Sequence, residues 1–179
     1  YPVTPYEAEQ HGQRACDTAF DVARTLMAAG INFDFIDHQS LSRAVVKDGK
    51  LVVEDAAASY AALVFPDMHA VRWTSVEKAA AFTEAGGMVL SVGALPSISD
   101  RAGRNDAELN ALNIQAFKAD CRLSSAEEAV AQIRDAFVQD VRGLRSPVLA
   151  QHRKVGPRDI YMVMGANPGD VVEFRATGS

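Results

Sequence analysis

Residues 84–96 read EAGGMVLSVGALP, and this stretch decides the fold class of the chain. Gly86 and Gly87 are typical of a helix end, because glycine adopts the left-handed backbone conformation there without a steric penalty. The run MVLSV that follows is short and almost wholly apolar, as in a strand that is buried on both faces of a parallel sheet. Gly93 then permits a sharp turn. A helix, a buried strand and a tight turn in this order indicate an α/β fold with an open sheet.

The turn after this strand lies where many α/β folds position a reactive group. A nucleophile elbow needs Ser or Cys at the apex, in a pattern such as G-x-S-x-G. Here Ser91 still belongs to the predicted strand, and the apex falls at Val92 or Gly93. Neither glycine-rich phosphate-binding motif occurs in the chain. We therefore predict no catalytic residue at this turn, and a serine-dependent amidase or hydrolase that uses Ser91 stays open as an alternative.

Upstream of this stretch, the sequence predicts one long helix and several strands. Apolar spacing predicts a helix over residues 6–29 that ends at Gly30. The alternation in Ile31–Asp37 (INFDFID) predicts a strand, and Asp48-Gly49 between two β-prone runs predicts a hairpin. The nearly continuous apolar run Tyr60–Phe65 predicts another buried strand.

Further helices are predicted on both sides of a polar loop. The first covers residues 75–86, with Thr74 or Ser75 as its cap. A loop is expected from Pro96 to about Asn105, and a helix over residues 106–117 follows it. The stretch SSAEEAVAQIRDAFVQDV (residues 124–141) predicts a last helix with Ser124 or Ser125 as its cap.

The composition changes at Pro147, so we divide the chain into an α/β module over residues 1–146 and a β-rich unit over residues 147–179. Three β-prone runs follow this boundary: Val148–Lys154, Asp159–Met164 and Val171–Ala176. They are connected by Gly156-Pro157 and by the turn at residues 167–170. Short turns between strands predict antiparallel pairing, as at the beginning of a β-sandwich.

Charge and composition exclude several classes of partner. The chain carries 18 Lys and Arg against 23 Asp and Glu, a formal charge of -5, so we expect no nucleic-acid partner. No apolar run approaches the roughly 20 residues of a membrane span, so we expect no membrane partner. The four histidines, at positions 11, 38, 69 and 152, show no metal-ligand spacing. No metal and no cofactor are therefore predicted.

The two cysteines and the two ends of the chain carry separate predictions. Cys16 and Cys121 are too far apart in sequence for a metal-ligand pair or a small disulfide scaffold. We interpret them as buried free thiols, and a disulfide between them stays open. The start at Tyr1 and the stop at Thr177-Gly178-Ser179 favour a segment of a longer polypeptide.

The loop after the strand Tyr60–Phe65 is the richest polar constellation in the sequence. Asp67 and His69 form a candidate acid/base pair, and Trp73 is able to stack on a sugar ring. Because ligands gather where strands of an open α/β sheet end, these three residues are the predicted ligand-binding residues. The alternative is structural: Asp67 braces the turn, His69 is solvated and Trp73 packs on the following helix.

Four stretches in this order resemble a known family. They are INFDFIDHQSL, AVVKDGKLVVEDAAASYAALVFPD, TSVEKAAAFTEAGGMVLSVGALP and HRKVGPRDIYMVMGANPGDVVEFRATG. Together they are similar to the class I glutamine amidotransferase-like module of multidomain glycoside hydrolases, closest to the α-L-rhamnosidase-like glycoside hydrolase family 106. The resemblance covers roughly residues 31–98 and 150–178. One departure is that Gly165-Ala166 separates the strand YMVM from Asn167.

The resemblance implies a flavodoxin-like, three-layer open sheet followed by antiparallel strands. In it, YPVTP (residues 1–5) corresponds to the exit from a first strand that the chain lacks. It also implies a non-catalytic accessory domain, because the catalytic carboxylates of such enzymes belong to a separate barrel domain. The implied partners are the remaining domains of the parent hydrolase or a second copy in a homo-oligomer. The alternative function is a small-molecule or sugar-binding module that uses the loop at residues 67–73.

Overall fold

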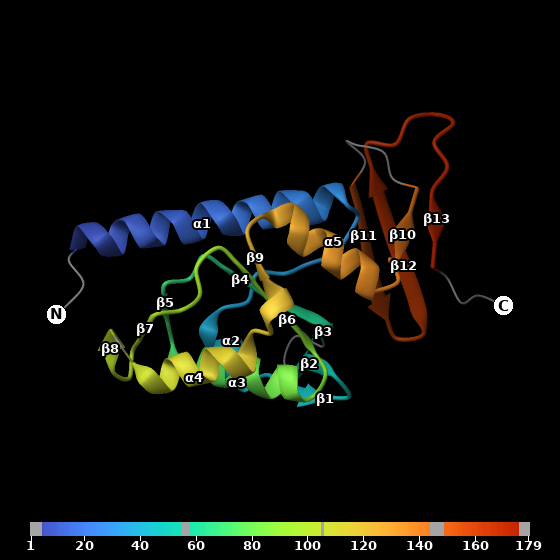
Figure 1. The fold of residues 1–179 in the computed structure, drawn as a ribbon. Coiled ribbons are helices and arrows are strands. Elements are labelled where there is room, and N and C mark those ends of the chain that lie inside the picture. Colours follow the sequence, from blue (N-terminus) through green and yellow to red (C-terminus); the bar gives the residue numbers. More distant parts are fainter. Residues whose placement is uncertain (1–4, 55–57, 105, 144–148, 176–179) are drawn as a thin grey trace.

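The computed structural model describes residues 5–54, 58–104, 106–143 and 149–175, and it has a mixed α/β fold (Figure 1). At its centre lies a parallel sheet of three strands in the order β4-β6-β9. The bounds of these strands are Ala62–Pro66, Met88–Val92 and Arg122–Leu123. The predicted α/β class and the two buried strands are confirmed. The described elements form no barrel.

Helices cover both faces of the central sheet (Figure 1). One face packs against α3 (Trp73–Glu84) and α4 (Ala107–Ala116), and the other against α1 (Pro5–Ala28) and α5 (Ala126–Ala136). Successive residues of β6 alternate between the two faces, because Val89 belongs to the first hydrophobic cluster and Leu90 to the second. The sheet is therefore the middle of three layers.

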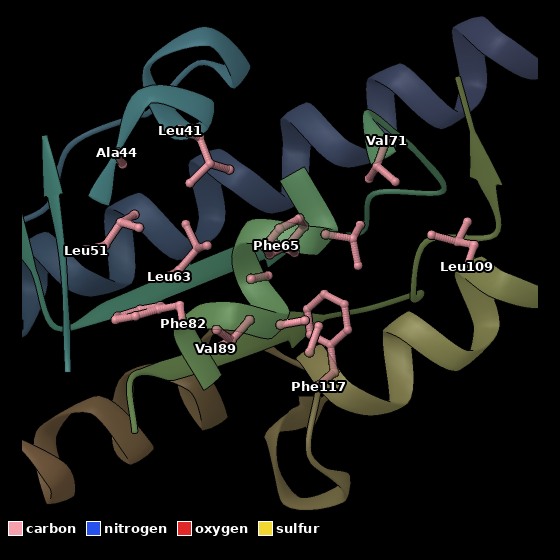
Figure 2. Close-up of a cluster of buried hydrophobic side chains, with 14 of the residues drawn as sticks. Leu41, Ala44, Leu51, Leu63, Phe65, Val71, Phe82, Val89, Leu109 and Phe117 are labelled. Atoms are coloured by element: carbon pink, nitrogen blue, oxygen red, sulfur yellow. The ribbon is translucent and has the colours of Figure 1, made fainter. Parts of the chain in front are cut away.

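The first hydrophobic cluster contains the largest buried side chains (Figure 2). Phe65 from β4 meets Phe117, which follows α4, edge to face with ring centroids 5.2 Å apart. Phe82 of α3 is fully buried in the same cluster, near Leu63 and Val89. Burial of such a side chain contributes about 2–3 kcal/mol, so this cluster joins β4, α3 and α4 into one unit.

The C-terminus of α3 follows the sequence prediction, and its N-terminus does not. Gly86 has φ 87°, and the Gly87 N–H donates to the Phe82 carbonyl at 2.8 Å. At the other end, Thr74 and Ser75 do not cap the helix, which begins earlier, at Trp73. Instead the Trp73 N–H donates to Asp100 Oδ1 at 2.7 Å. A carboxylate from a distant loop thus replaces the local cap that the sequence predicted.

Helices α4 and α5 both have local caps, of which the sequence predicted only that of α5. The Asp106 carboxylate accepts hydrogen bonds from two backbone N–H groups at the start of α4. At α5 the cap is Ser125 and not Ser124, because the Ser125 hydroxyl accepts from the Glu128 N–H. The Glu128 carboxylate accepts in return from the Ser124 N–H at 2.8 Å. This reciprocal contact is a capping box, displaced by one residue.

The predicted hairpin at Asp48-Gly49 is confirmed. Strands β1 (Val45–Lys47) and β2 (Lys50–Val53) pair antiparallel, and β3 (Ala58–Tyr60) pairs with β2. Asp48 and Gly49 have φ of 52° and 67°, as a two-residue turn between right-handed twisted strands requires. The short helix α2 (His38–Arg43), which the sequence analysis did not predict, precedes the hairpin. Asp37 caps it by accepting from the Gln39 and Ser40 N–H groups.

The predicted strand Ile31–Asp37 is wrong for the described structure. The long helix before it is confirmed, and Gly30 ends that helix with φ 71°. Residues 31–37 then form no strand. Ile31 and Phe33 are half-buried while Asn32 and Asp34 are exposed, but Phe35, the third apolar position of the predicted alternation, is 65% exposed and Ile36 is half-buried instead. The physical reason is that a strand needs a backbone partner, and no described strand forms a ladder with this segment.

The predicted loops at 66–73 and 96–105 contain a small sheet. Strands β5 (Ala70–Val71), β7 (Ile98–Ser99) and β8 (Gly103–Arg104) pair in the order β5-β7-β8. These strands are only two residues long, so their composition carries no strand signal. Asn105, where the predicted loop ended, lies outside the described residues, as do Tyr1 and Thr177.

The C-terminal strands confirm one predicted pairing and correct another. Strands β11 (Leu149–Val155) and β12 (Arg158–Met164) form the predicted hairpin around Gly156-Pro157. The third strand, β13 (Glu173–Phe174), pairs with β10 (Val141–Arg142) and not with β12. Antiparallel pairing therefore spans the boundary that we placed at residues 146–147. Val148 and Ala176, at the outer ends of two predicted runs, lie outside the described residues.

Both cysteines are free, so the disulfide alternative is not realised. The prediction that both are buried is wrong for Cys16, which is exposed on α1, whereas Cys121 is partly buried. Within the described ranges, none of the helices combines the length and the apolar character that crossing a membrane requires.

Candidate functional site

The predicted pair Asp67 and His69 lies at the carboxyl end of β4, beside the turn that ends β6. Because β4 and β6 are parallel, the loops that follow them meet at the same edge of the sheet. The Asp67 backbone has φ 43°, and its Oδ1 accepts the Ala94 N–H at 2.8 Å. The carboxylate of Asp67 thus holds the turn after β6, which is the structural role that the sequence left as an alternative.

Helix α1 contributes two further polar side chains to this edge. The Arg14 Nε lies 3.7 Å from Asp67 Oδ2, and the Arg14 Nη2 lies 3.2 Å from His69 Nε2. The His11 ring lies 4.2 Å from the His69 ring, centroid to centroid. We call His11, Arg14, Asp67 and His69 the strand-end cluster. It joins α1 to the loop after β4 and was not predicted, because 55 residues separate Arg14 from His69.

The hydrogen bond from Arg14 defines the proton positions on His69. A guanidinium only donates, so His69 Nε2 accepts and the ring proton resides on Nδ1. Burial lowers the pKa of His69, and the neighbouring His11 lowers it further. His69 is therefore a neutral imidazole at pH 7. The predicted solvation of His69 in the structural alternative is also incomplete, since its side chain is only 22% exposed.

Trp73, the third predicted ligand-binding residue, is engaged elsewhere. The Arg101 guanidinium lies 3.7 Å from the centroid of its ring, and this cation–π contact covers one face. The ring also packs against the first hydrophobic cluster. In the part of the chain that the structure describes, Trp73 makes no hydrogen bond, ion pair or ring contact with Asp67 or His69. The structure therefore brings Asp67 and His69 together, whereas Trp73 contacts Arg101.

The turn after β6 has no accessible position for a nucleophile. Ser91 is 0% exposed within the strand, and its Oγ has no hydrogen-bond partner. Gly93, at the predicted apex, has φ 84°, and a Cβ there would lie 2.8 Å from Asp67 Oδ1. A larger side chain at this apex would collide with the carboxylate that holds the turn. The strand-end cluster is thus a polar surface without a nucleophile at the adjacent turn.

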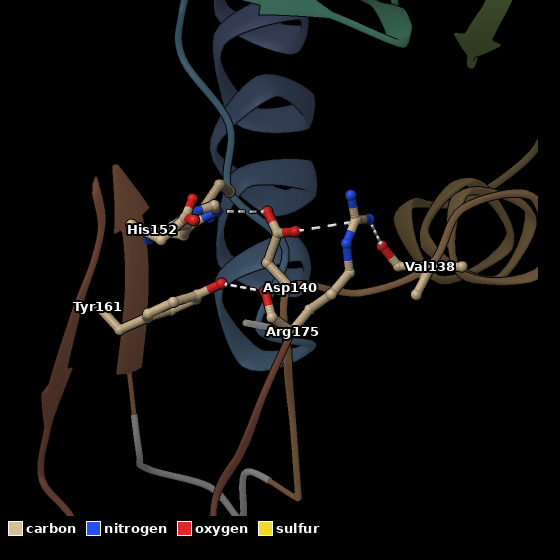
Figure 3. Close-up of polar contacts among 7 residues, drawn as sticks. Val138, Asp140, His152, Tyr161 and Arg175 are labelled. Carbon is tan, nitrogen blue, oxygen red and sulfur yellow. Dashed lines mark hydrogen bonds and ion pairs between the residues drawn. The ribbon is translucent and has the colours of Figure 1, made fainter. Parts of the chain in front are cut away.

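A second polar cluster, which the sequence analysis missed, surrounds His152 on β11 (Figure 3). Its Nδ1 lies 3.0 Å from Asp140 Oδ2, and its Nε2 lies 2.8 Å from Asp159 Oδ1. The ring stacks on Tyr161 at 4.3 Å, with 7° between the planes. Since both ring nitrogens face carboxylates, both are donors and the ring is an imidazolium.

The pKa of His152 reflects this environment. Burial by itself would lower the pKa, but the hydrogen bonds to Asp140 and Asp159 outweigh burial, and the pKa is raised. Charge-assisted hydrogen bonds of this kind are roughly twice as strong as those between neutral groups. His152 is therefore a charged centre that attracts two carboxylates from separate segments of the chain.

Arg175 and Tyr161 extend this cluster to the other C-terminal strands (Figure 3). The Arg175 Nη1 lies 3.7 Å from Asp140 Oδ1, and the Tyr161 hydroxyl donates to the Arg175 carbonyl at 2.6 Å. Asp140 precedes β10, His152 and Tyr161 lie on β11 and β12, and Arg175 follows β13. The cluster ties four strands together. Its one sequence signal is the hairpin register, which places His152 opposite Tyr161.

Neither polar cluster has the composition of a metal centre. No group of three or more His, Cys, Asp or Glu side chains that could hold a metal ion occurs in the residues covered by the structure. In both clusters an arginine guanidinium lies beside the carboxylates and supplies the positive charge. The carboxylate oxygens are thereby engaged by arginine and histidine nitrogens and by backbone N–H groups.

Comparison with known proteins supplies no relative for this chain. The sequence matches no protein-family model and no curated protein, and no solved structure matches its fold.

Proposed function

We propose that the chain is a non-catalytic accessory domain of a carbohydrate-degrading glycoside hydrolase, in which it braces the catalytic barrel or a subunit interface. The carbohydrate assignment rests on the resemblance to the α-L-rhamnosidase-like family 106. The accessory role rests on the chain's own chemistry. The turn after β6 has no nucleophile, and Asp67 is engaged in holding that turn.

One observation carries the bracing role: an apolar stripe along β12 is open to solvent. Ile160, Met162 and Met164 occupy alternate positions of β12 and are 50%, 49% and 50% exposed. A two-stranded sheet is marginally stable without a layer that covers its apolar face. An apolar stripe of this kind is typical of a surface that a neighbouring domain or subunit covers.

The central sheet supports a flavodoxin-like assignment for the α/β module. Three parallel strands follow each other in chain order, with helices on both faces, which is one half of a doubly wound sheet. We propose that the antiparallel strands after residue 147 begin a β-sandwich, with the face around Met162 directed to its second layer.

Two measurements test the accessory role. The chain by itself is expected to hydrolyse aryl α-L-rhamnosides and aryl galactosides no faster than buffer, and turnover at an enzyme-like rate would contradict the proposal. In the parent enzyme, Met162→Glu is expected to lower the melting temperature of the assembled protein. The matched control is Lys154→Gln, which makes the same change of one charge unit on the other face of the hairpin, because Lys154 lies three positions from Gln151, the residue opposite Met162. Equal effects of the two variants would contradict a covered apolar face.

A second candidate function is a sugar- or small-molecule-binding module. The strand-end cluster favours it, because Arg14 and the neutral imidazole of His69 lie at the edge where α/β sheets bind ligands. Calorimetry with monosaccharides and nucleotides tests it. Saturable binding that His69→Ala abolishes would support it, and Trp73→Ala serves as the control, because Trp73 lies in a separate environment beneath Arg101.

A further inference from the structure

A cavity of about 540 Å³ lies along the open edge of β4. Two uninterrupted runs of residues line it, Gly30–Ile36 on one side and Ser59–Pro66 on the other. A strand that turns one face to a cavity lines it with every second residue, because successive side chains point to opposite faces. An uninterrupted run indicates that the backbone edge itself borders the cavity. Two backbone edges therefore face each other across this space.

The hydrogen bonds at the two ends of β4 show which backbone groups face the cavity. The Met88 N–H donates to the Ala61 carbonyl at 3.3 Å, and the Asp67 N–H donates to the Val92 carbonyl at 2.6 Å. In a parallel ladder, the residues bonded to one neighbour alternate with those that face the other side. The N–H and C=O groups of Ala62 and Val64 consequently point away from β6. Within the described ranges, β4 is the last strand of its sheet, with no strand on this side.

The opposite wall has the sequence of a strand but lacks a partner. Ile31 and Phe33 pack against the second hydrophobic cluster, and Ile36 packs against the first. Segment 31–37 thus contributes side chains to both layers, as a sheet strand does, although it forms no ladder. One extended strand between this segment and β4 would supply a partner to both edges.

The other walls of the cavity define the chemistry of that strand. Val22 and Leu26 of α1 line one side, and Leu41 and Leu51 line the other. All four side chains are buried and apolar. A strand in the cavity therefore needs apolar residues on both of its faces, like the other strands of the sheet.

The direction of α1 determines which way the strand runs. Arg14, in the first half of α1, lies beside Asp67, which follows the carboxyl end of β4. Leu26, near the end of α1, and Ile31 belong with Ala62, at the amino end of β4, to the second hydrophobic cluster. Helix α1 is thus antiparallel to β4. Polypeptide that leads directly into the N-terminus of α1 would run parallel to β4, as in a β-α-β unit. Helix α1 begins at Pro5, six residues or about 9 Å of helix before His11, which lies in the strand-end cluster at the carboxyl edge of the sheet. A short connection therefore joins a strand in the cavity to the start of α1.

We propose that the cavity is a strand-accepting slot, filled by an extended apolar segment that runs parallel to β4 and continues into α1. The segment completes the sheet by bonding to Ala62 and Val64 on one side and to residues 31–36 on the other. The slot is independent of the hydrolase assignment, because it follows from the edge of β4 and from the cavity alone.

The test uses the whole chain extended ahead of Tyr1 by five Val or Ile residues and a short Gly/Ser linker. The control carries the same extension with Pro at the second and fourth of the five positions, because proline cannot donate to a ladder. Hydrogen exchange of the Ala62 and Val64 amides is the readout. Relative to the proline control, the extension is expected to slow their exchange at least about tenfold, because they become hydrogen-bonded. Equal exchange in the two proteins would overturn the proposal.

A second measurement uses Ala62→Pro, which removes an N–H on the slot side while the bonds to β6 remain. The strand extension is expected to raise the melting temperature over the proline control, and Ala62→Pro to reduce that gain. The environment-sensitive apolar dye anilinonaphthalene sulfonate is expected to bind the proline control and to be excluded from the strand-extended chain. Equal dye binding to both would show that the cavity stays open to small apolar molecules, and it would contradict the slot.

Discussion

The carboxylate of Asp67 accepts the backbone N–H of Ala94 at 2.8 Å, so the loop after β4 holds the turn after β6. The space between them is small, because a Cβ on Gly93 would lie 2.8 Å from Asp67 Oδ1. This contact explains why the turn after β6, which the sequence analysis singled out, has a structural role: it connects the loops that follow β4 and β6.

Gly93→Ala is expected to destabilise the chain by at least about 2 kcal/mol, because it combines a left-handed backbone with a collision. Gly86→Ala is the matched control: Gly86 has φ 87°, but a Cβ at this position would have nothing within 4 Å. It is expected to cost only about 1 kcal/mol. Urea unfolding of both variants measures the difference, which should shrink in an Asp67→Ala background. An unchanged difference there would show that Asp67 is not the colliding group.

The unfolding free energy is expected to depend on pH through His152. Its pKa in the folded chain is raised above the ordinary value of 6.5, so its contribution is complete below about pH 6.5 while Asp140 and Asp159 stay ionised. The contribution is lost as the pH rises through the folded pKa. Histidine NMR titration should place the midpoint of His152 above 6.5 and that of His69 below it.

The control for His152 is Asp159→Asn, which keeps the shape of the side chain and removes one carboxylate charge. The midpoint of His152 is expected to fall in this variant, and so is the pH dependence of stability above pH 6.5. If the midpoint of His152 in the unaltered chain lies at or below 6.5, the doubly hydrogen-bonded imidazolium is wrong.

Asp106→Ala is expected to cost more stability than Ser125→Ala, although both residues cap helices. Asp106 accepts the Glu108 N–H at 3.0 Å, the Leu109 N–H at 3.2 Å and the Ser99 hydroxyl at 3.1 Å. The Ser125 hydroxyl accepts the Glu128 N–H, at 3.3 Å. We expect losses of about 2 and at most about 1 kcal/mol, measured by chemical denaturation. A greater loss for Ser125→Ala would contradict this order.

Ser91→Ala is expected to leave stability unchanged or to raise it by up to about 1 kcal/mol, because the Ser91 hydroxyl is buried without a hydrogen-bond partner. Thermal unfolding measures this effect. In the same preparation, a fluorophosphonate should not label the unaltered chain. Stoichiometric labelling that Ser91→Ala removes would instead support the serine hydrolase alternative.

The two thiols are expected to react at different rates with Ellman's reagent at pH 8. Cys16 is exposed, whereas burial and the neighbouring Asp120 raise the pKa of Cys121 and reduce its thiolate fraction. A fast phase of one thiol should therefore precede a slow one, and Cys16→Ser should remove the fast phase. Two equal rates would show that Cys121 is as accessible as Cys16.

The features that the sequence predicted correctly depend on neighbours along the chain. Asp48-Gly49 forms its turn because both residues tolerate positive φ. Gly86 ends α3, and Ser125 caps α5, through groups within one helical turn. The apolar runs of β4 and β6 predict that these strands are buried, because exposing a continuous apolar run to water is unfavourable.

The features that the sequence missed depend on residues far apart. Asp100 replaces the predicted cap of α3 from 27 positions away, and Arg14 reaches His69 across 55. The His152 cluster needs four strands to meet. Composition records none of these contacts, because each depends on how separate segments pack.

Segment Ile31–Asp37 shows both sides of this division. The alternation of its side chains predicted correctly that Ile31 and Phe33 turn inward, whereas Phe35, at the next alternating position, is 65% exposed. Whether the segment becomes a strand was decided by the tertiary structure, because a ladder requires a second backbone at hydrogen-bonding distance. The sequence thus determined periodicity, turns and local caps, which are properties of adjacent residues. Packing alone decided the partners of each edge and each charge.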